Sequence, residues 1–458
     1  MIKMNPLDAS WLVVESRETP MHVASLLVFS PPPKARSDYL QKLIAFLRQA
    51  REFQPPWNLK LAGSPLRRLL PAWETDHALD LDYHLRHSAL PAPGGERELG
   101  VLVSRLHSHP LDFSRPLWEC HLIEGLEGGR FALYTKMHHS LVDGVGGMRM
   151  LSRALAPSPR VRTPAPWSVV LPAREGAQAR ASGALQTVLE RVRGQARSLP
   201  ELARALRRLL AAARANASQA QGLVPPYAAP PSVLNVRITG ARRFATQQYE
   251  LARLKRLAKS ADATLNDLVL WLCATALRRF LKEAGALPRK PLTAGIPVNV
   301  RPAGEVSVGN AISFMMASLA TDVADPRRRL EAIKASTSAA KAHLQSLPRE
   351  ALTQYTVLLM APYMLELLTG LGGRARPIFN LTISNVPGPR ERLYFRGARL
   401  EAMYPVSLLS HGQALNITCL SYADTLNFGF TGCRDTLPHM QRLAVYCGES
   451  LTELESLY

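Results

Sequence analysis

The residues best suited to chemistry lie in one short run, from His138 to Gly144, which reads His-His-Ser-Leu-Val-Asp-Gly. An imidazole has an unperturbed pKa of about 6.5, so it is mostly neutral at cellular pH and can accept a proton. A positioned base of this kind typically accelerates a reaction by roughly 10² to 10⁴. A neutral alcohol is a poor nucleophile, so the pair could serve acyl transfer from a thioester to a hydroxyl group, and the ring could then protonate the departing thiolate.

Asp143 and Gly144 have a different expected role. Asp143 is too near His139 in sequence to be assumed its hydrogen-bond partner, and a carboxylate in a turn can hold an arginine from elsewhere in the chain. The reaction needs only one base, so we expect Asp143 to be structural. Gly144 supplies the freedom that a tight turn requires. The alternative interpretation of His138 and His139 is a purely structural pair, satisfied by hydrogen bonds.

The elements that must position this run form a β-hairpin. Residues 117–125 and 130–137 are strand-like and are joined across Glu127-Gly128-Gly129. Every other residue of the second run shares one face: Phe131, Leu133, Thr135 and Met137. The two histidines follow at its end, a common position for a base that faces a cleft. We expect the chain then to turn into a helix that begins near Met148.

The second half of the chain also contains legible elements. Thr264, with Asp267 three residues later, resembles a capping box, and the apolar spacing that follows predicts a helix ending near Gly285. Residues 292–300 and 378–383 are typical of buried strands that run into turns, and residues 415–421 and 426–431 suggest a second hairpin. The sequence thus predicts a mixed α/β fold: one domain over residues 1–158, a Pro- and Arg-rich linker over 159–231 and a second domain over 232–458.

The cysteine content and the apolar segments indicate the cellular compartment in which the protein works. The five cysteines among 458 residues form no CxxC pair and no Cys/His cluster with metal-ligand spacing, which indicates a reducing cytosol and no bound metal. The first residues lack the organisation of a signal peptide. The most apolar stretch, 352–371, contains Gln354, Pro362 and Glu366, so we expect no transmembrane segment.

The net charge of +20 is partly regional, because residues 160–214 contain eleven arginines and three glutamates. The absence of aromatic-basic interleaving and of zinc-finger spacing argues against nucleic acid. A basic helix over about 175–220 is either a solvated face or a contact with an anionic bilayer or lipid droplet. Residues 358–371 could join that contact or belong to the core.

Residues 138–144 match the HHxxxDG signature of the CoA-dependent acyltransferase superfamily. The chain most closely resembles the bacterial wax ester synthase/diacylglycerol acyltransferases, and the resemblance covers almost the whole chain except the basic linker. It rests on five further motifs, in order: Leu7-Asp8-Ala9-Ser10-Trp11, Pro116-Leu117-Trp118, Asn266-Asp267, Pro297-Val298-Asn299-Val300-Arg301 and Ile383-Ser384-Asn385-Val386-Pro387-Gly388-Pro389.

The resemblance implies two chloramphenicol-acetyltransferase-like domains, with an active-site channel between them that acyl-CoA and the acceptor enter from different sides. It makes His139 the general base of a direct transfer, without an acyl-enzyme, and gives His138 a supporting role. It also implies acyl-CoA as co-substrate with no permanently bound cofactor, and a fatty alcohol or diacylglycerol as acceptor. The expected location is cytoplasmic, peripheral to a membrane or lipid droplet. The sequence does not choose between the acceptors and does not specify the oligomeric state.

The resemblance also implies that the other motifs belong to the site, although each has a simpler interpretation. Asn266 and Asp267 could serve only the helix end. Pro116, Leu117 and Trp118 would shape the acyl-CoA side or only pack the hairpin. Ser384 and Asn385 could donate hydrogen bonds to the tetrahedral oxyanion, but a segment rich in Asn, Pro and Gly favours turn geometry.

Two other functions fit parts of the pattern. His138 and Asp143 satisfy the H-x₄-D pattern of glycerophospholipid acyltransferases, which the doubled histidine and the other motifs disfavour. A non-catalytic lipid-droplet or lipid-binding protein would keep the fold without the reaction, and the intact HHxxxDG argues against it. The signatures of serine hydrolases, nucleotide hydrolases, zincins and dinucleotide-binding proteins are absent from the sequence.

Overall fold

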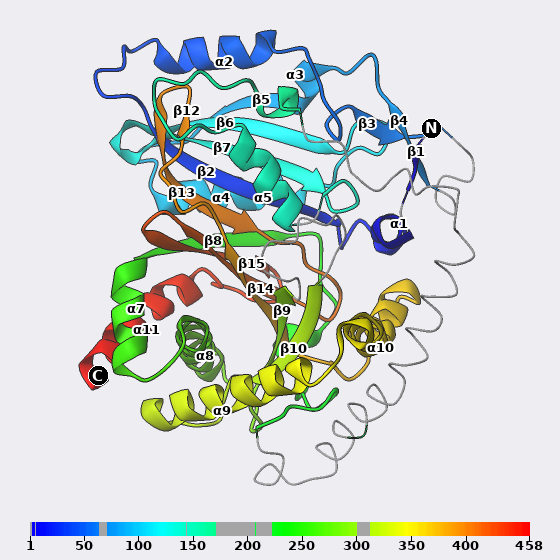
Figure 1. Ribbon diagram of the computed structural model, residues 1–458, viewed down its shortest axis with the longest axis vertical. Coiled ribbons are helices and arrows are strands. Elements are labelled where there is room, and N and C mark those ends of the chain that lie inside the picture. The colour runs from blue at the N-terminus through cyan, green and yellow to red at the C-terminus, as the bar shows by residue number, and fades with distance from the viewer. Residues whose placement is uncertain are drawn as a thin grey trace.

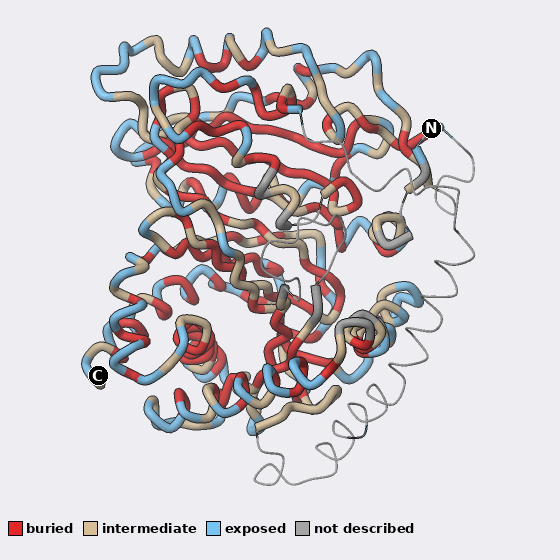
Figure 2. Tube along the Cα trace, in the orientation of Figure 1, coloured by how far each residue is buried: buried red, intermediate tan, exposed pale blue. Residues whose placement is uncertain are grey.

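The computed structural model describes residues 2–4, 6–63, 71–142, 144–170, 207, 222–299 and 312–458. Within these residues the chain forms two six-stranded sheets, one above the other in Figure 1, and a three-stranded sheet beside the first. Figure 2 shows that buried residues follow the strands of both sheets, with exposed residues mainly on the surrounding helices and loops. The mixed α/β architecture predicted from the sequence is confirmed.

The first sheet has the strand order β12-β13-β2-β7-β6-β5. Its strands are β2 (His22–Ser30), β5 (Leu85–Ala89), β6 (Trp118–Leu126), β7 (Arg130–His138), β12 (Tyr394–Phe395) and β13 (Ala398–Val406). The last two come from the C-terminal quarter of the chain, so the sheet is completed by a crossover. β13 pairs with β2 and also packs along β14 and β15 of the second sheet, which ties the two halves together.

The predicted hairpin is confirmed as β6 and β7, joined by a short 3₁₀ turn, η1 (Glu127–Gly129). Gly128 and Gly129 both have positive φ, a conformation that glycine adopts without a steric penalty. Phe131, Leu133 and Met137 belong to one hydrophobic cluster, whereas Ala132 and Tyr134 face another. This alternation is the one expected from the sequence.

Several further elements surround the first sheet: α1 (Pro6–Val14), α2 (Tyr39–Gln49), α3 (Leu81–His84), α4 (Glu96–Ser108), α5 (Gly144–Arg153), η2 (Pro166–Ser168) and the small sheet of β1 (Ile2–Lys3), β3 (Leu59–Leu61) and β4 (Ala72–Thr75). The helix expected near Met148 therefore begins earlier, at Gly144. The prediction was wrong by four residues because the glycines that suggested an extended turn are accommodated in the first turns of α5.

The second sheet has the strand order β10-β9-β11-β14-β15-β8. Its strands are β8 (Arg242–Glu250), β9 (Thr293–Asn299), β10 (Ile312–Ser318), β11 (Leu381–Pro387), β14 (Leu415–Tyr422) and β15 (Thr425–Cys433). The pairs of β11 with β9 and β14 are parallel. The predicted second hairpin is confirmed as β14 and β15.

Five helices pack around this sheet, on the lower side of Figure 1: α7 (Leu251–Ser260), α8 (Leu265–Glu283), α9 (Pro326–Gln345), α10 (Arg349–Leu368) and α11 (Arg442–Leu457); η3 (Val233–Asn235) precedes them. The predicted capping box is confirmed, because Thr264 Oγ1 accepts from the Asp267 N–H while the Asp267 carboxylate accepts from the Thr264 N–H. α8 is almost completely buried and forms the centre of the second core.

The edge of the second sheet is sealed by α4 from the first half. The backbone N–H groups of Arg242 and Phe244 in β8 donate to Ser108 Oγ and Ser104 Oγ, each at 2.8 Å. These two hydroxyls replace the partner strand that β8 lacks on this side, since an unpaired buried N–H would be costly. The contact positions the end of α4 at the boundary between the two halves.

Other sequence expectations have mixed outcomes. The basic helix of the linker lies outside the described residues except for Arg207, and the boundaries at 158 and 231 stay predictions. All five cysteines are buried and unpaired. Among the helices of the described ranges, none has the length and apolar character needed to cross a bilayer.

Candidate active site

The two histidines lie where β7 ends. His138 is the last residue of the strand, and its backbone N–H donates to the Leu117 carbonyl at 3.0 Å. His139 follows, and its N–H donates to the Met21 carbonyl at 2.8 Å. Segments that precede β2 and β6 therefore fix the backbone of the pair from both sides.

The His138 side chain is completely buried and is hydrogen-bonded at both ring nitrogens. Nδ1 accepts from the Ser140 backbone N–H at 3.1 Å and lies 2.5 Å from Ser140 Oγ. Nε2 lies 2.6 Å from the Glu15 carboxylate. Since Nδ1 is an acceptor, the ring proton belongs on Nε2, where it donates to Glu15. A ring held in this way is suited to support and not to exchange protons with a substrate.

Glu15 is a residue of the site that sequence reasoning missed. It lies between α1 and β2, and its Oε2 accepts from His138 and, at 2.9 Å, from the backbone N–H of Met21. The carboxylate therefore holds His138 and also the segment whose carbonyl holds His139. Glu15 is 123 positions from His138. The sequence could not indicate this contact, because two residues so far apart along the chain share no local pattern.

The His139 side chain differs from its neighbour because it is only partly buried. Its ring packs against the Trp11 indole of α1, with ring centroids 4.3 Å apart and planes tilted by 35°. Trp11 belongs to one of the motifs of the resemblance, although no role was assigned to it. His138 is thus buried and held at both ring nitrogens, whereas His139 is partly exposed, although its Nδ1 atom is buried.

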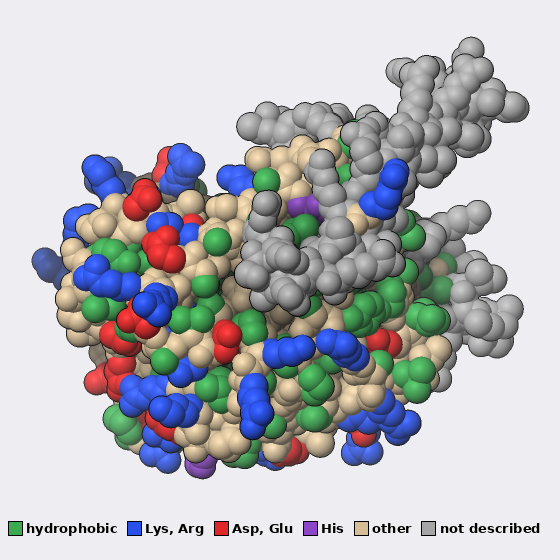
Figure 3. Space-filling view, turned by 90° about the horizontal axis from the view of Figure 1, so that it is seen from below, with side chains coloured by type: hydrophobic (Ala, Val, Ile, Leu, Met, Phe, Trp, Pro, Cys, Tyr) green, Lys and Arg blue, Asp and Glu red, His purple; other side chains and the backbone are tan. Residues whose placement is uncertain are grey.

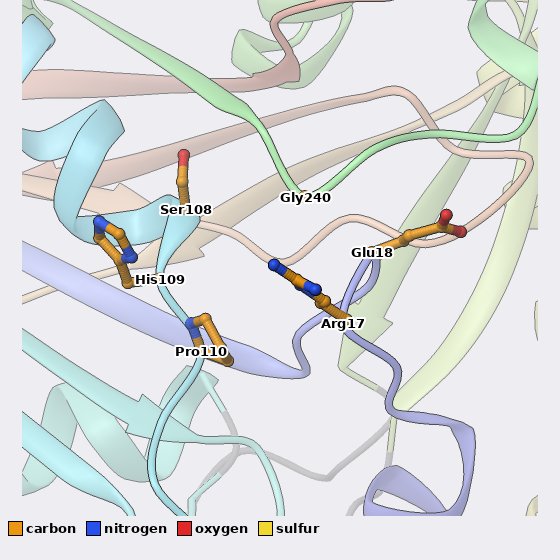
Figure 4. A pocket seen from close by; sticks show the side chains of 6 residues that line it. All are labelled: Arg17, Glu18, Ser108, His109, Pro110 and Gly240. Carbon is orange, nitrogen blue, oxygen red and sulfur yellow. The ribbon is translucent and has the colours of Figure 1, made fainter.

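A cleft of about 440 Å³ lies at the boundary between the two halves, close to this site. It is lined by Arg17 and Glu18 before β2, by Ser108, His109 and Pro110 after α4, and by Gly240 before β8. Figure 4 shows the Arg17 side chain reaching toward the Ser108–Pro110 segment, while the Glu18 carboxylate points the other way. Glu18 lies 3.1 Å from His411 Nε2 and 3.4 Å from the Arg237 guanidinium of the second half. The His109 carbonyl, in the cleft wall, accepts a hydrogen bond from Lys136 Nζ at 2.9 Å. Lys136 lies on β7, two residues before His138.

Pro116, Leu117 and Trp118 are all buried. Leu117 contributes the carbonyl that holds His138, so this motif does reach the site, through its backbone. Trp118 instead packs into an aromatic cluster: its ring stacks on His84 at 4.4 Å and on Trp167 at 5.6 Å, and its Nε1 donates to the Trp57 carbonyl at 2.7 Å. Leu117 and Trp118 thus pack in the core of the first sheet, and a role of the motif on the acyl-CoA side stays a prediction.

Asn266 and Asp267 lie in the first turn of α8, on the second sheet. Beyond the capping box, Asp267 Oδ1 accepts from the Thr337 hydroxyl at 2.6 Å, which links α8 to α9. Asn266 is partly buried beside it. The hydrogen bonds of Asp267 thus support the helix end and its packing, and a role of this pair in the site stays a prediction.

Ser384 and Asn385 lie in strand β11, which continues to Pro387. The expectation that they belong to a turn was wrong, because parallel pairing with β14 aligns Ser384 with Thr418 and Asn385 with Cys419. The chain turns only after the strand, at Gly388, where a Cβ would lie 2.2 Å from the Ser421 carbonyl oxygen. Both residues lie on the second sheet, in a strand whose Val386 packs against the hydrophobic cluster of the first sheet, and their role in the site stays a prediction.

Of the remaining conserved positions of the HHxxxDG signature, only Gly144 lies within the described residues. Gly144 is the first residue of α5. Asp143 lies outside the described residues, so its structural role and its arginine partner stay predictions. Within the described ranges there is no group of three or more His, Cys, Asp or Glu residues that could hold a metal ion.

A buried polar layer adjoins His138 on the same face of the first sheet. His22 pairs with His138 across β2 and β7, and its Nε2 donates to the His107 carbonyl at 2.9 Å. The His107 ring bridges the Tyr134 hydroxyl at 2.9 Å and the Ser407 carbonyl at 3.1 Å. Burial, together with the charges of Arg242 and Lys136, lowers the pKa of His107 to about 3. Burial is also the main reason that the pKa of His22 lies well below its usual value, and the charges of His107 and Lys136 lower it further.

This layer predicts acid sensitivity of the fold. His22 and His107 are neutral when folded but bind protons with pKa values near 6.5 when unfolded, so the unfolded state gains protons as the pH falls. Their contribution to stability is complete above about pH 6.5, and each histidine is expected to remove up to about 1.4 kcal/mol per pH unit below it. Urea unfolding midpoints measured between pH 7.5 and 4.5 test this.

A carboxylate of the same layer titrates in a separate range. Burial alone would raise the pKa of Glu119, but the His121 hydrogen bond and the charges of Lys136 and Arg86 lower it to about 2. The contribution of Glu119 to the free energy of unfolding is lost only below about pH 4.5. Between about pH 4.5 and 6.5, the change of stability with pH therefore comes from the histidines. The variant His107→Gln should show a shallower slope there. An unchanged slope in this variant would contradict the assignment to His107.

Comparisons with known proteins give a consistent result. The family model described as the wax ester synthase/diacylglycerol acyltransferase catalytic domain matches residues 4–269, and that of the WS/DGAT C-terminal domain matches residues 308–455. A Mycobacterium tuberculosis protein with the provisional name diacylglycerol O-acyltransferase is 48% identical and is covered over 97% of its length by 99% of this chain. The O-acyltransferase WSD of Acinetobacter baylyi is 38% identical over 100% of this chain and 98% of its own.

Solved structures confirm the fold class. A wax ester synthase/diacylglycerol acyltransferase from Marinobacter aquaeolei is 40% identical, with a TM-score of 0.78 and 99% coverage of both chains. The first condensation domain of the calcium-dependent antibiotic synthetase is similar over 99% of this chain and 95% of its own, with a TM-score of 0.59 and 18% identity, which bears on the fold alone. The two-part CoA-dependent acyltransferase fold expected from HHxxxDG is thus confirmed.

Proposed function

Because the chain belongs to the wax ester synthase/diacylglycerol acyltransferase family, we propose that it transfers a fatty acyl group from acyl-CoA to a long-chain alcohol or to diacylglycerol. The observation that carries the proposal is the contrast within the histidine pair. His138 is buried and hydrogen-bonded at both ring nitrogens, whereas His139 beside it is only partly buried. Such a pair combines a rigid support with one accessible base.

In the proposed reaction, His139 takes the proton of the acceptor hydroxyl as its oxygen attacks the thioester carbonyl. The new C–O bond forms, the tetrahedral intermediate collapses, and the C–S bond breaks. The imidazolium then returns the proton to the CoA thiolate, so free thiol and ester are the products. No acyl-enzyme is needed, since one histidine serves as base and then as acid.

The other residues act through position. Glu15 and Ser140 fix the His138 ring, and the carbonyls of Leu117 and Met21 fix the backbone of the pair, so His139 is held with little freedom. A base that is already oriented loses less entropy when the substrates bind. Trp11 limits the rotation of the His139 ring from the side of α1.

We propose the interdomain cleft as one entrance to the site for the substrates. It lies at the end of α4 and adjoins the residues that surround His138, and Arg17 gives it a cation suited to a phosphate of CoA. Both substrates carry long alkyl chains, and both product classes are apolar lipids. We therefore also propose that the protein works peripherally, at a membrane or lipid-droplet surface in the cytoplasm.

The decisive experiment is an acceptor comparison with purified protein. Palmitoyl-CoA is supplied with hexadecanol, with dioleoylglycerol, with a lysophospholipid or with no acceptor, and the release of free CoA thiol is measured together with the ester formed. We expect thiol release that depends on hexadecanol or dioleoylglycerol, in equimolar amount to wax ester or triacylglycerol.

The remaining arms decide between functions. Release only with the lysophospholipid would favour the H-x₄-D type of reaction. A protein that binds palmitoyl-CoA but releases no thiol with any acceptor would be a lipid-binding protein, and the proposed function would be wrong.

A further inference from the structure

Helix α10 has two apolar sides, although only one of them faces the core. Ala351, Tyr355 and Leu359 follow one another at intervals of one turn and are buried against the second sheet. Tyr363 continues this side and its hydroxyl contacts Ser410. Helix α10 therefore packs on the rest of the protein through this one stripe of residues.

A neighbouring side of the helix, centred about 120° around the axis from this stripe, is exposed and also apolar. Leu358, Leu365 and Leu368 are 49%, 60% and 52% exposed, and Leu371, just beyond the helix, is 50% exposed. At 100° per residue, Leu358, Ala361, Leu365 and Leu368 fall on one arc of about 80°. Figure 3 shows hydrophobic side chains gathered at the right of the view, on the side of the molecule where α10 lies. We call these four residues with Leu371 the α10 face.

Helix α10 lies beside α1, the helix that carries Trp11. α10 contacts α1, whose own outer residue Val13 is 51% exposed. Two residues before it on α1, Trp11 packs on the His139 ring. Val13 and Trp11 point to different sides of α1, so α1 has one apolar residue at the surface and another against the candidate base.

The first charged residues that follow the α10 face in the sequence are basic. From Ala351 to Gly373 the only charged residue is Glu366, which is partly buried on the core side of the helix. Arg374 and Arg376 follow and are exposed. Arg237 donates to the Gly370 carbonyl just beyond the helix but is also paired with Glu18, so the positive charge at this end comes from Arg374 and Arg376. An uncharged apolar arc that is flanked by arginines is complementary to a layer with an alkyl interior and anionic headgroups.

We propose that the α10 face is the surface by which the protein lies on an anionic phospholipid layer. This inference rests on the proposed function for the identity of the acceptor, and it adds which surface meets the lipid. The leucines insert among the acyl chains while Arg374 and Arg376 contact the headgroup phosphates. A lipophilic acceptor then passes to the site directly from the layer, on the side of the molecule where α10 lies beside α1.

The test measures binding of the full chain to vesicles of phosphatidylcholine with 30% phosphatidylglycerol, and to phosphatidylcholine alone, by cosedimentation. The double variant Leu365→Ser/Leu368→Ser should bind the mixed vesicles at least tenfold more weakly than the wild type. The matched control is Val445→Ser on α11, which removes an apolar side chain of similar exposure, 54%, at another place. It should bind as the wild type does.

A charge variant separates the two components of binding. Arg374→Glu/Arg376→Glu should lose most of the preference for the anionic vesicles and little of the binding to phosphatidylcholine. Circular dichroism melts of all variants verify that they are folded, which is expected because each replaced side chain is exposed. Wild-type binding by both double variants would overturn the proposal.

An activity ratio links binding to acceptor delivery. Turnover with dioleoylglycerol presented in mixed vesicles is divided by turnover with a short-chain, water-soluble alcohol. The ratio should fall at least fivefold in Leu365→Ser/Leu368→Ser and stay at the wild-type value in Val445→Ser. Loss of vesicle binding without a change in this ratio would overturn the delivery step.

Two further outcomes have separate meanings. If the wild type is dimeric without lipid and Leu365→Ser/Leu368→Ser is monomeric, the α10 face binds a second copy and the proposal is wrong. If no acceptor supports thiol release in any protein, the proposed function fails, while cosedimentation still decides whether this face binds lipid.

Discussion

Replacement of His139 by alanine is expected to lower kcat for acyl transfer by about 10³-fold, because the acceptor hydroxyl would lose the group that removes its proton. The side chain is partly buried and packs mainly on Trp11, so its removal leaves the hydrogen bonds of His138, Glu15 and Ser140 intact. The KM for palmitoyl-CoA should change little. Initial rates of thiol release with hexadecanol or dioleoylglycerol as acceptor measure both quantities.

The matched control for this experiment is His77→Ala, which removes an exposed histidine from the same half of the chain. It should keep wild-type turnover. Thermal melts of the two variants separate catalysis from folding, and we expect both to melt within a few degrees of the wild type. A His139→Ala protein with more than a tenth of wild-type turnover would show that another group is the base.

Replacement of Trp118 by alanine is expected to lower the free energy of unfolding by about 3 to 5 kcal/mol, the usual cost of removing a large aromatic side chain from a core. The indole is fully buried between His84, Trp57 and Trp167, and its N–H donates to a backbone carbonyl that would lose its partner. Urea unfolding followed by circular dichroism measures the change.

The same variant decides between the two interpretations of the Pro116-Leu117-Trp118 motif. If its side chains only pack the first sheet, protein that remains folded at low temperature should have a KM for acyl-CoA close to that of the wild type. Trp118→Phe, which keeps an aromatic ring, should recover more than half of the lost stability. A stable Trp118→Ala protein with a strongly raised KM would instead assign the side chain to the acyl-CoA site.

The elements that could be predicted from the sequence are those whose cause is local. The hairpin that carries the histidines follows from alternation and from Gly128 and Gly129 between the strands. The start of α8 follows from the reciprocal hydrogen bonds of Thr264 and Asp267. In both cases the residues that determine the structure are within a few positions of one another.

The features that escaped prediction have distant causes. Glu15 reaches His138 across 123 positions. Ser384 and Asn385 have the composition of a turn, but hydrogen bonding to β14 extends their strand. The resemblance supplied the choice of His139 over His138, and the structure adds a physical basis for it, since one ring is locked and the other is accessible. The role of His139 stays a prediction until its variant is assayed.

The crossover by which β13 joins the first sheet has a consequence for how the protein is made. During synthesis, residues 22–30 leave the ribosome long before residues 398–406, so one side of β2 has no neighbour while most of the chain is still being translated. An unpaired apolar strand edge is prone to pair with other chains. The first sheet can therefore reach its final form only after the C-terminal quarter emerges, and until then the β2 edge is open to pairing with other chains.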